Sequence, residues 1–336
     1  MKRKKIYIAY TGGTIGMKQS SRGYIPAEGY LTETVKNNAE FTREEMPLFD
    51  IHEYCPLIDS SDMSPLHWQM IADDIQEKYQ QYDGFVVLHG TDTMAYTASA
   101  LSFMFENLTK PVIVTGSQIP LSQLRSDGQV NLLNAMYLAA NYPIAEVSLF
   151  FNNKLFRGNR ATKAHADGFD AFASPNLQPL AQSGINIQLK EGKLSPYVDQ
   201  ALQITPVVQQ PIGILYLYPG ISIEIINNVI SSNIKALILL SFGVGNAPQQ
   251  GEFLAALKAA SERGVVIINL TQCIQGQVNM GGYATGNALL NSGVLSGFDM
   301  TLEACIAKLH YLFSQKLEIE TVRHLMQDNL RGELTR

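Results

Sequence analysis

Two turns rich in hydroxyl groups contain the residues of this chain best suited to chemistry. Thr11-Gly12-Gly13-Thr14-Ile15-Gly16 follows an apolar run at residues 6–10, and His89-Gly90-Thr91-Asp92-Thr93-Met94 follows a second apolar run at residues 85–88. In a parallel α/β sheet both turns would lie at the carboxyl ends of strands, where such folds bind their ligands. Two threonines, an aspartate and several backbone amides would then share one crevice, which suits nucleophilic attack on a carbonyl group.

The first turn has two competing interpretations. A dinucleotide-binding loop has glycines at relative positions one, three and six and an acidic residue about twenty residues later. Here Thr11 replaces the first glycine, and Glu33 lies in a helix-like stretch rather than at the end of a strand. The glycines could also serve only the tight geometry between strand and loop. Two threonines that flank paired glycines favour a reactive hydroxyl over a phosphate-binding loop.

The second turn also has two interpretations, which are compatible. Asp92 and Thr93 could cap the helix that follows, the commonest use of such residues. Asp92 could instead bind a substrate ammonium group, with Thr91 as a second hydroxyl. A helix N-terminus also offers free amides to a carboxylate or an oxyanion.

Two further polar segments matter only if the fold brings them to these turns. Asp59-Ser60-Ser61-Asp62 precedes a predicted helix, and Arg160-Ala161-Thr162-Lys163 follows a predicted strand. Most loop lysines are solvated, so Lys163 becomes interesting only if it is buried beside Thr91. A hydroxyl is a poor nucleophile at neutral pH without a neighbouring base, and a desolvated lysine is a plausible one.

Composition narrows the class of protein. With 30 acidic against 25 basic residues and a net charge of -5, the chain lacks the basic character of a nucleic-acid surface. The apolar stretch behind the basic start is too short for an export signal, and no apolar run is long enough to span a bilayer. The three cysteines and six histidines show no metal-ligand spacing. We therefore expect a soluble cytoplasmic protein with neither a disulfide framework nor a zinc site.

Alternating strand and helix patterns predict an α/β fold of two domains, with mostly parallel sheets and helices on both faces. The larger N-terminal catalytic domain is expected at residues 1–190, a linker at 191–211 and a smaller C-terminal domain at 212–336. The polar stretch from about Ser183 already lacks a strong period. Predicted strands are 6–10, 50–54, 85–88, 112–114, 147–151, 212–218, 236–241 and 265–270, and predicted helices are 65–79, 94–108, 130–140, 253–260 and 303–312.

The motifs taken together resemble the L-asparaginase family, in its bacterial type I cytoplasmic branch. The resemblance covers nearly the whole chain, and the two threonine turns in this order are highly specific. Further agreement lies in Thr115-Gly116-Ser117-Gln118, Arg125-Ser126-Asp127-Gly128 and Gly243-Val244-Gly245-Asn246-Ala247-Pro248.

The resemblance implies roles for individual residues. Thr14 stands at the position of the nucleophile, and Tyr24 at that of a tyrosine on a mobile lid, here the short loop 18–29. Thr91, Asp92 and Lys163 match a second triad-like group, so the residues alone leave open which threonine attacks first. The positions that match substrate binding are Asp59, Ser60, Ser61, Thr91, Asp92 and Ser117.

The implied reaction is hydrolysis of L-asparagine to L-aspartate and ammonia through a β-aspartyl-enzyme intermediate, and it needs no metal or organic cofactor. The family also implies self-association as a dimer or a dimer of dimers, with active sites completed across an intimate dimer. Two alternatives stay open: an amidase that acts on glutamine, a D-amino acid or a peptidyl amide, and a ligand-binding regulatory module on the same fold.

Some type I relatives bind asparagine at a second, regulatory site in the C-terminal domain. The matching positions here are Thr162, Thr271 and Cys273. Leu240 stands where the regulated relatives have an arginine, although Arg160 or Lys163 could supply a positive charge instead. We therefore expect weak or absent regulation by asparagine.

Overall fold

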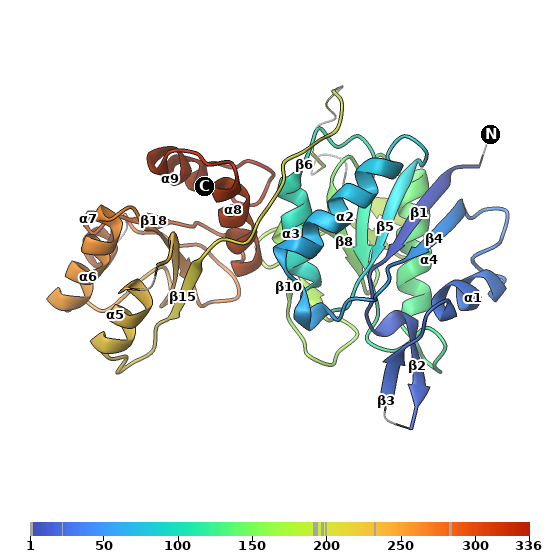
Figure 1. Cartoon of the computed structure of the whole chain (residues 1–336), viewed down its shortest axis with the longest axis horizontal. Coiled ribbons are helices and arrows are strands. Elements are labelled where there is room, and N and C mark those ends of the chain that lie inside the picture. The colour runs from blue at the N-terminus through green and yellow to red at the C-terminus, as the bar shows by residue number, and fades with distance from the viewer. Residues whose placement is uncertain are drawn as a thin grey trace. The chain divides into compact units, whose positions relative to one another are not determined.

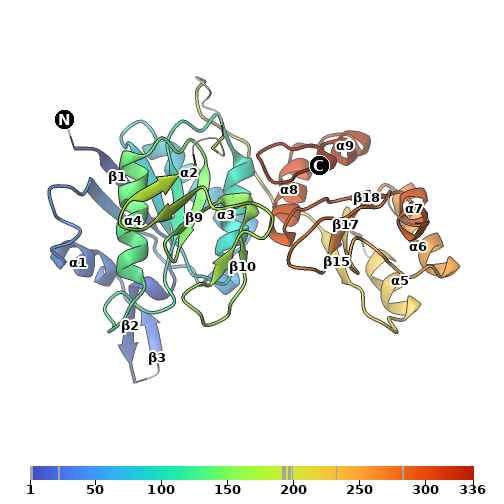
Figure 2. The same cartoon turned by 180° about the vertical axis from the view of Figure 1, so that it is seen from behind.

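The computed structural model describes residues 3–21, 23–190, 194–195, 198, 200–231, 233–281 and 284–336. The chain divides into two compact units, Met1–Val207 and Val208–Arg336. Each unit has strands interleaved with helices, as Figures 1 and 2 show. The predicted α/β class, with a larger N-terminal and a smaller C-terminal part, is confirmed.

An eight-stranded sheet forms the centre of the N-terminal unit. Its five strands from β8 to β4 run parallel, whereas β9, β12 and β13 add antiparallel pairs at the other edge. The parallel strands β8, β7, β5 and β1 are buried and show no alternation of polar residues, whereas the edge strand β4 alternates exposed and half-buried residues. The order is β13 (Ile187–Leu189), β12 (Ala181–Ser183), β9 (Lys154–Arg157), β8 (Val147–Phe151), β7 (Val112–Thr115), β5 (Gly84–Leu88), β1 (Lys5–Tyr10) and β4 (Leu48–Glu53).

Helices cover both faces of this sheet. Helices α1 (Tyr30–Asn37) and α4 (Gly128–Asn141) pack their apolar residues on one face, against a core that includes Ile6, Ile8 and Tyr10. Helices α2 (Pro65–Lys78) and α3 (Met94–Met104) lie on the opposite face, nearest the viewer in Figure 1. Helix α2 begins where predicted, at Ser64 followed by a proline.

The strand order brings the two threonine turns together. Strand β1 lies between β4 and β5, and Tyr10 at its carboxyl end is in register with Leu88 at the end of β5. After β1, the chain adds β4 to the sheet on one side of β1 and then adds β5, β7 and β8 on the other side. The direction in which strands are added to the sheet therefore reverses between β1 and β5. Open α/β sheets place their ligand sites at such a reversal.

A four-stranded parallel sheet forms the centre of the C-terminal unit. Its order is β15 (Ile212–Tyr216), β16 (Ala236–Ser241), β17 (Val266–Thr271) and β18 (Val294–Ser296). The apolar core joins these strands to α5 and α6. The helices are α5 (Ile223–Ser231), α6 (Gly251–Glu262), α7 (Ala284–Asn291), α8 (Leu302–Ser314) and α9 (Ile319–Gln327).

Several predicted boundaries were wrong. The helix predicted at 94–108 ends at Met104, because Phe105–Glu106 turns into the short strand β6, which pairs with β14 (Gln203–Ile204). The strand predicted at 212–218 ends at Tyr216. The loop predicted at 18–29 is largely a hairpin of β2 (Met17–Ser20) and β3 (Gly23–Pro26).

The stretch without a strong period, predicted from about Ser183, contains two short strands, β13 and β14, and begins where β12 ends. Strands β12 and β13 extend the large sheet, and β14 lies within the predicted linker 191–211. Residues 191–193, 196–197 and 199 of that linker lie outside the described residues. These strands are only two or three residues long, too short for an apolar period to be recognised, and they form through backbone pairing. None of the described helices has the length and apolar character that crossing a bilayer requires.

Candidate active site

The two threonine turns pack tightly against each other above the ends of β1 and β5. Gly13 has a φ of 96°, and a Cβ atom added to it would lie 2.5 Å from the Gly90 nitrogen. Thr11 is buried and donates its hydroxyl to the Leu88 carbonyl at 2.9 Å, which ties the first turn to β5. Glycine at position 13 is therefore required both by the backbone conformation and by the close approach of the second turn.

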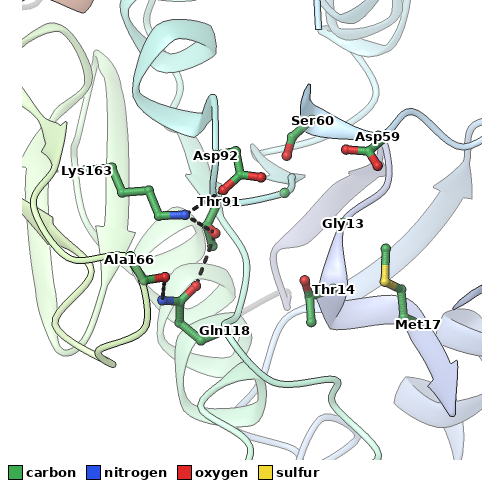
Figure 3. A pocket seen from close by; sticks show the side chains of 11 residues that line it. Gly13, Thr14, Met17, Asp59, Ser60, Thr91, Asp92, Gln118, Lys163 and Ala166 are labelled. Carbon is green, nitrogen blue, oxygen red and sulfur yellow. Dashed lines mark hydrogen bonds and ion pairs between the residues drawn. The ribbon is translucent and has the colours of Figure 1, made fainter. Parts of the chain in front are cut away.

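A cavity of about 300 Å³ opens where the turns meet. In the view of Figure 3, Lys163 and Ala166 lie at one side, Thr14 and Met17 at the other, and Thr91 and Asp92 between them. Six of the sequence-predicted site residues thus share one pocket. Its lining consists of Gly13, Thr14, Met17, Asp59, Ser60, Gly90, Thr91, Asp92, Gln118, Lys163 and Ala166.

Lys163 connects the third predicted segment to the second threonine turn. It lies in the short strand β10 (Thr162–Lys163), which pairs with β11 (Phe172–Ala173). Its Nζ donates to Thr91 Oγ1 at 2.9 Å and to Asp92 Oδ1 at 2.7 Å, as the dashed lines in Figure 3 show. The predicted contact between Lys163 and Thr91 is present. As the donor in both hydrogen bonds, Lys163 Nζ polarises the Thr91 hydroxyl and pairs with the Asp92 carboxylate, and a role for Lys163 as a base stays a prediction.

The first interpretation of Asp92 and Thr93, as helix caps, is not what the structure shows. Thr93 occupies the N-cap position of α3 but makes no side-chain cap. Its hydroxyl donates instead to the Ser60 carbonyl at 2.6 Å. The Asp92 carboxylate is exposed and pairs with Lys163. Thr93 therefore connects the second threonine turn to the Asp59–Asp62 segment, and Asp92 connects it to Lys163. The exposed carboxylate of Asp92 can also bind a cationic group of a ligand.

The Asp59–Asp62 segment forms the neighbouring wall. Asp59 precedes the short 3-10 helix η2 (Ser60–Asp62), and its Oδ1 accepts the Ser61 backbone N–H and hydroxyl, both at 2.9 Å. Hydrogen bonds from the Ser61 backbone and side chain lower the pKa of Asp59. Asp59 and the buried Ser60 line the pocket. Ser61 is exposed and is not among the lining residues.

Tyr24 and Ser117 lie outside the described lining of the pocket. Tyr24 is on the hairpin strand β3, with 47% of its surface exposed. Ser117 is buried, and its hydroxyl donates to the Ile119 carbonyl at 2.6 Å. Contact of either side chain with substrate stays a prediction.

Gln118 is a pocket residue that sequence reasoning did not select. Its Oε1 accepts the Thr91 hydroxyl at 3.1 Å, and its Nε2 donates to the carbonyls of Ala166 and Gly168 at 3.2 and 3.1 Å. The Asp127 carboxylate accepts the Gln118 N–H at 3.0 Å, and burial raises the pKa of that carboxyl group. The sequence did contain a signal for Gln118. This residue follows the parallel strand β7, just as the two threonine turns follow the parallel strands β1 and β5.

The positions matched to a regulatory site lie in both units. Thr162 is in β10 of the first unit. In the second unit, Thr271 ends β17, donates its hydroxyl to the Gly243 carbonyl at 2.5 Å, and accepts the Cys273 N–H at 3.0 Å. Leu240 is 8% exposed within β16. A regulatory role for these residues stays a prediction.

No cluster of three or more potential metal ligands of the histidine, cysteine, aspartate and glutamate types occurs among the residues that the structure describes. The chemistry available in the pocket is that of hydroxyl groups, one ammonium group, carboxylates and backbone amides. This set can attack an acyl carbon and stabilise a developing oxyanion.

Comparison with known proteins agrees with this geometry. Two family models match, "Asparaginase, N-terminal" over residues 5–194 and "Glutaminase/Asparaginase C-terminal domain" over residues 211–326. The chain is 64% identical over 335 residues to L-asparaginase 1 of Escherichia coli strain K12, covering 100% of this chain and 99% of that protein.

Solved structures are similar over the same extent. L-asparaginase I from Vibrio cholerae has a TM-score of 0.94 at 63% identity, with 99% of this chain and 100% of that chain covered. The thermostable L-asparaginase from Thermococcus kodakarensis has a TM-score of 0.89 at 29% identity, with 99% of each chain covered. The similarity therefore extends through both units.

Proposed function

The chain belongs to the asparaginase family and is an L-asparaginase, and from this premise we propose that it hydrolyses L-asparagine through a threonine nucleophile and a β-aspartyl ester. The observation that carries the mechanism is the Thr91–Lys163–Asp92 hydrogen-bonded set in the pocket that Thr14 also lines. Two hydroxyls, one of them polarised by an ammonium group, suit a reaction in two acyl-transfer steps.

In the first step, Thr14 Oγ attacks the side-chain amide carbon of asparagine. The carbonyl oxygen becomes an oxyanion that backbone amides of the two turns stabilise. The carbon–nitrogen bond then breaks, the hydroxyl proton of Thr14 ends on the leaving nitrogen, and ammonia departs. Tyr24 assists this transfer when the β2–β3 hairpin closes over the pocket and excludes water.

In the second step, water attacks the β-aspartyl ester. Thr91, polarised by Lys163, orients this water, one proton of which returns to Thr14 Oγ as the ester bond breaks. The products of the cycle are L-aspartate and ammonia, and the enzyme is regenerated without a metal or an organic cofactor. No oxidation or reduction occurs in either step.

Substrate orientation depends on charge. The exposed Asp92 carboxylate binds the α-ammonium group, which would otherwise meet the cationic Lys163. Asp59, Ser60, Ser61, Thr91 and Ser117 are the remaining proposed substrate-binding residues. Asp59 already accepts the Ser61 N–H, so it presents an organised polar wall to the ligand.

Assembly and location follow from the family resemblance. We expect self-association as a dimer or a dimer of dimers, with the partner subunit completing each active site. We also propose a cytoplasmic location, which the type I resemblance supports.

The proposed function is tested by measuring ammonia release with L-asparagine, L-glutamine, D-asparagine and a peptidyl amide over a range of concentrations. L-asparagine is expected to have the highest kcat/KM. A higher kcat/KM for another amide would replace the substrate assignment, and binding of asparagine without turnover would indicate a regulatory module. Thr14→Ala is expected to fold normally and lose kcat by on the order of 10³-fold or more. Retention of more than about a tenth of wild-type kcat would contradict the nucleophile.

A further inference from the structure

A chain of three buried side chains lies beneath the second threonine turn. Trp68 of α2 donates its Nε1–H to Thr97 Oγ1 of α3 at 3.2 Å. Thr97 Oγ1 lies 2.8 Å from His89 Nε2, and His89 Nδ1 lies 2.7 Å from the Gly90 carbonyl oxygen. His89 is 1% exposed and Thr97 is fully buried. None of these three side chains lines the pocket.

The direction of every hydrogen bond in this chain follows from its two ends. An indole nitrogen can only donate and a carbonyl oxygen can only accept. Because the Gly90 carbonyl can only accept, His89 Nδ1 must be protonated, and in a neutral ring Nε2 is then unprotonated and accepts the Thr97 hydroxyl. His89 Nδ1 then carries the proton and donates it to the Gly90 carbonyl. Burial lowers the pKa of His89 to about 4, so the ring is neutral at pH 7 and this tautomer is the one present.

The hydrogen bond to the Gly90 carbonyl determines how the next amide is oriented. The Gly90–Thr91 peptide bond is trans, so its carbonyl and its N–H point in opposite directions. With the carbonyl held toward the buried histidine, the Thr91 N–H points away from that histidine, and both Gly90 and Thr91 line the pocket. Within the described residues, no hydrogen bond from this N–H to a protein acceptor is found.

We propose that His89, oriented by Thr97 and Trp68, is a positioning residue that presets the Thr91 N–H as a donor to the oxyanion of the reaction. The inference rests on the proposed acyl-enzyme mechanism, which generates that oxyanion twice. A donor that is already aimed before substrate binds needs no reorganisation as charge develops, and this is the origin of its effect on rate. In the opposite tautomer the Nδ1 lone pair would face the Gly90 carbonyl and repel it.

Two isosteric variants separate the two ends of the histidine ring. His89→Asn places an amide N–H near the position of Nδ1 and can keep the hydrogen bond to the Gly90 carbonyl. His89→Gln reaches the position of Nε2, can accept from Thr97, and loses the donor to Gly90. We expect kcat of His89→Gln to fall by about 10- to 100-fold, whereas His89→Asn stays within about threefold of wild type.

The ratio of kcat to KM effects distinguishes this role from a structural one. An oxyanion donor acts in the transition state, so KM for asparagine and competitive inhibition by L-aspartate should stay close to wild type in His89→Gln. Equal kcat losses in the two variants, or a loss confined to KM, would overturn the proposal. If the wild type turns over asparagine through an ester on Thr14 and the variants still behave alike, only this inference fails.

Variants at Thr97 provide a second test of the proposal, which can be used even if a histidine variant does not fold. Thr97→Val removes the hydroxyl that selects the tautomer, and Thr97→Ser keeps it. We expect kcat to fall by about tenfold in Thr97→Val and to be restored in Thr97→Ser, at unchanged KM. Imidazole ¹⁵N NMR should show a protonated Nδ1 and an unprotonated Nε2 for His89 in the wild type. The opposite pattern of protonation would overturn the proposal.

Discussion

Gly13 and Gly90 lie so close that a Cβ atom on Gly13 would be 2.5 Å from the Gly90 nitrogen and 2.6 Å from its Cα. The contact presses the two threonine turns together and sets the positions of Thr14 and Thr91. Both turns belong to the ends of neighbouring strands, so neither can move aside without disturbing the sheet.

Gly13→Ala should therefore disrupt catalysis through geometry alone. The alanine meets backbone atoms of the second turn and must adopt a φ of 96°, which L side chains rarely do. We expect kcat to fall by about 10²-fold, because displacement by about 1 Å has an effect of this size. Gly251→Ala, where an added Cβ meets nothing within 4 Å, is the matched control and should leave kcat unchanged. Near-normal turnover by Gly13→Ala would show that the turns are not held in this way.

Asp92→Asn tests the proposed recognition of the substrate ammonium. The change keeps the shape of the side chain and removes its charge, so kcat/KM for asparagine should fall steeply. Amides that lack the α-amino group should lose much less. Rates for both classes are measured in the wild type and the variant. Equal losses for both would assign Asp92 a role in holding Lys163 instead.

Gln118→Leu removes an amide that joins Thr91 to the carbonyls of Ala166 and Gly168. Each such hydrogen bond contributes about 1 kcal/mol, so we expect kcat to fall by about tenfold or more. Gln129→Leu is the control, since the Gln129 amide bonds the exposed Glu40 and not the pocket. Identical kinetics in the two variants would exclude a role for Gln118 in the reaction.

The sequence was sufficient to predict the chemical centre of the fold. Apolar runs without alternation predicted the parallel strands β1 and β5, and short turns behind them predicted that Thr14 and Thr91 would meet. Those predictions succeeded because strand order and strand direction constrain the ends of neighbouring strands. The capped start of α2 was also predictable, because Ser64 and the following proline are local signals.

Other features depended on contacts that no local pattern encodes. Lys163 reaches Thr91 through a two-residue strand, and Gln118 enters the pocket while its neighbour Ser117 turns away. The short strands β12 and β14 form through backbone pairing with β9 and β6, and β13 pairs in turn with β12. In each case side-chain direction or pairing is decided by tertiary structure rather than by composition.

Cooperativity in asparagine should be weak or absent. Leu240 is a nearly buried strand residue where the regulated relatives present an arginine to the effector carboxylate. Losing one charge-assisted hydrogen bond costs about 1.5–3 kcal/mol, which is comparable to a typical coupling free energy. Steady-state rates over a wide range of asparagine concentrations should follow a hyperbola. A sigmoidal curve that is abolished by changing Thr271 or Cys273 would show that a regulatory site survives without the arginine.

The central claim, that Thr14 carries the β-aspartyl ester, is tested most directly by locating that ester. Wild-type enzyme is mixed with L-asparagine, quenched in acid within one turnover, and digested with trypsin for mass spectrometry. Cleavage after lysine and arginine, except before proline, places Thr14 and Thr91 on different peptides, 6–18 and 79–125. The account predicts an added aspartyl mass on peptide 6–18, assigned to Thr14 by fragmentation and absent from Thr14→Ala. An aspartyl mass on peptide 79–125, assigned to Thr91, would contradict it.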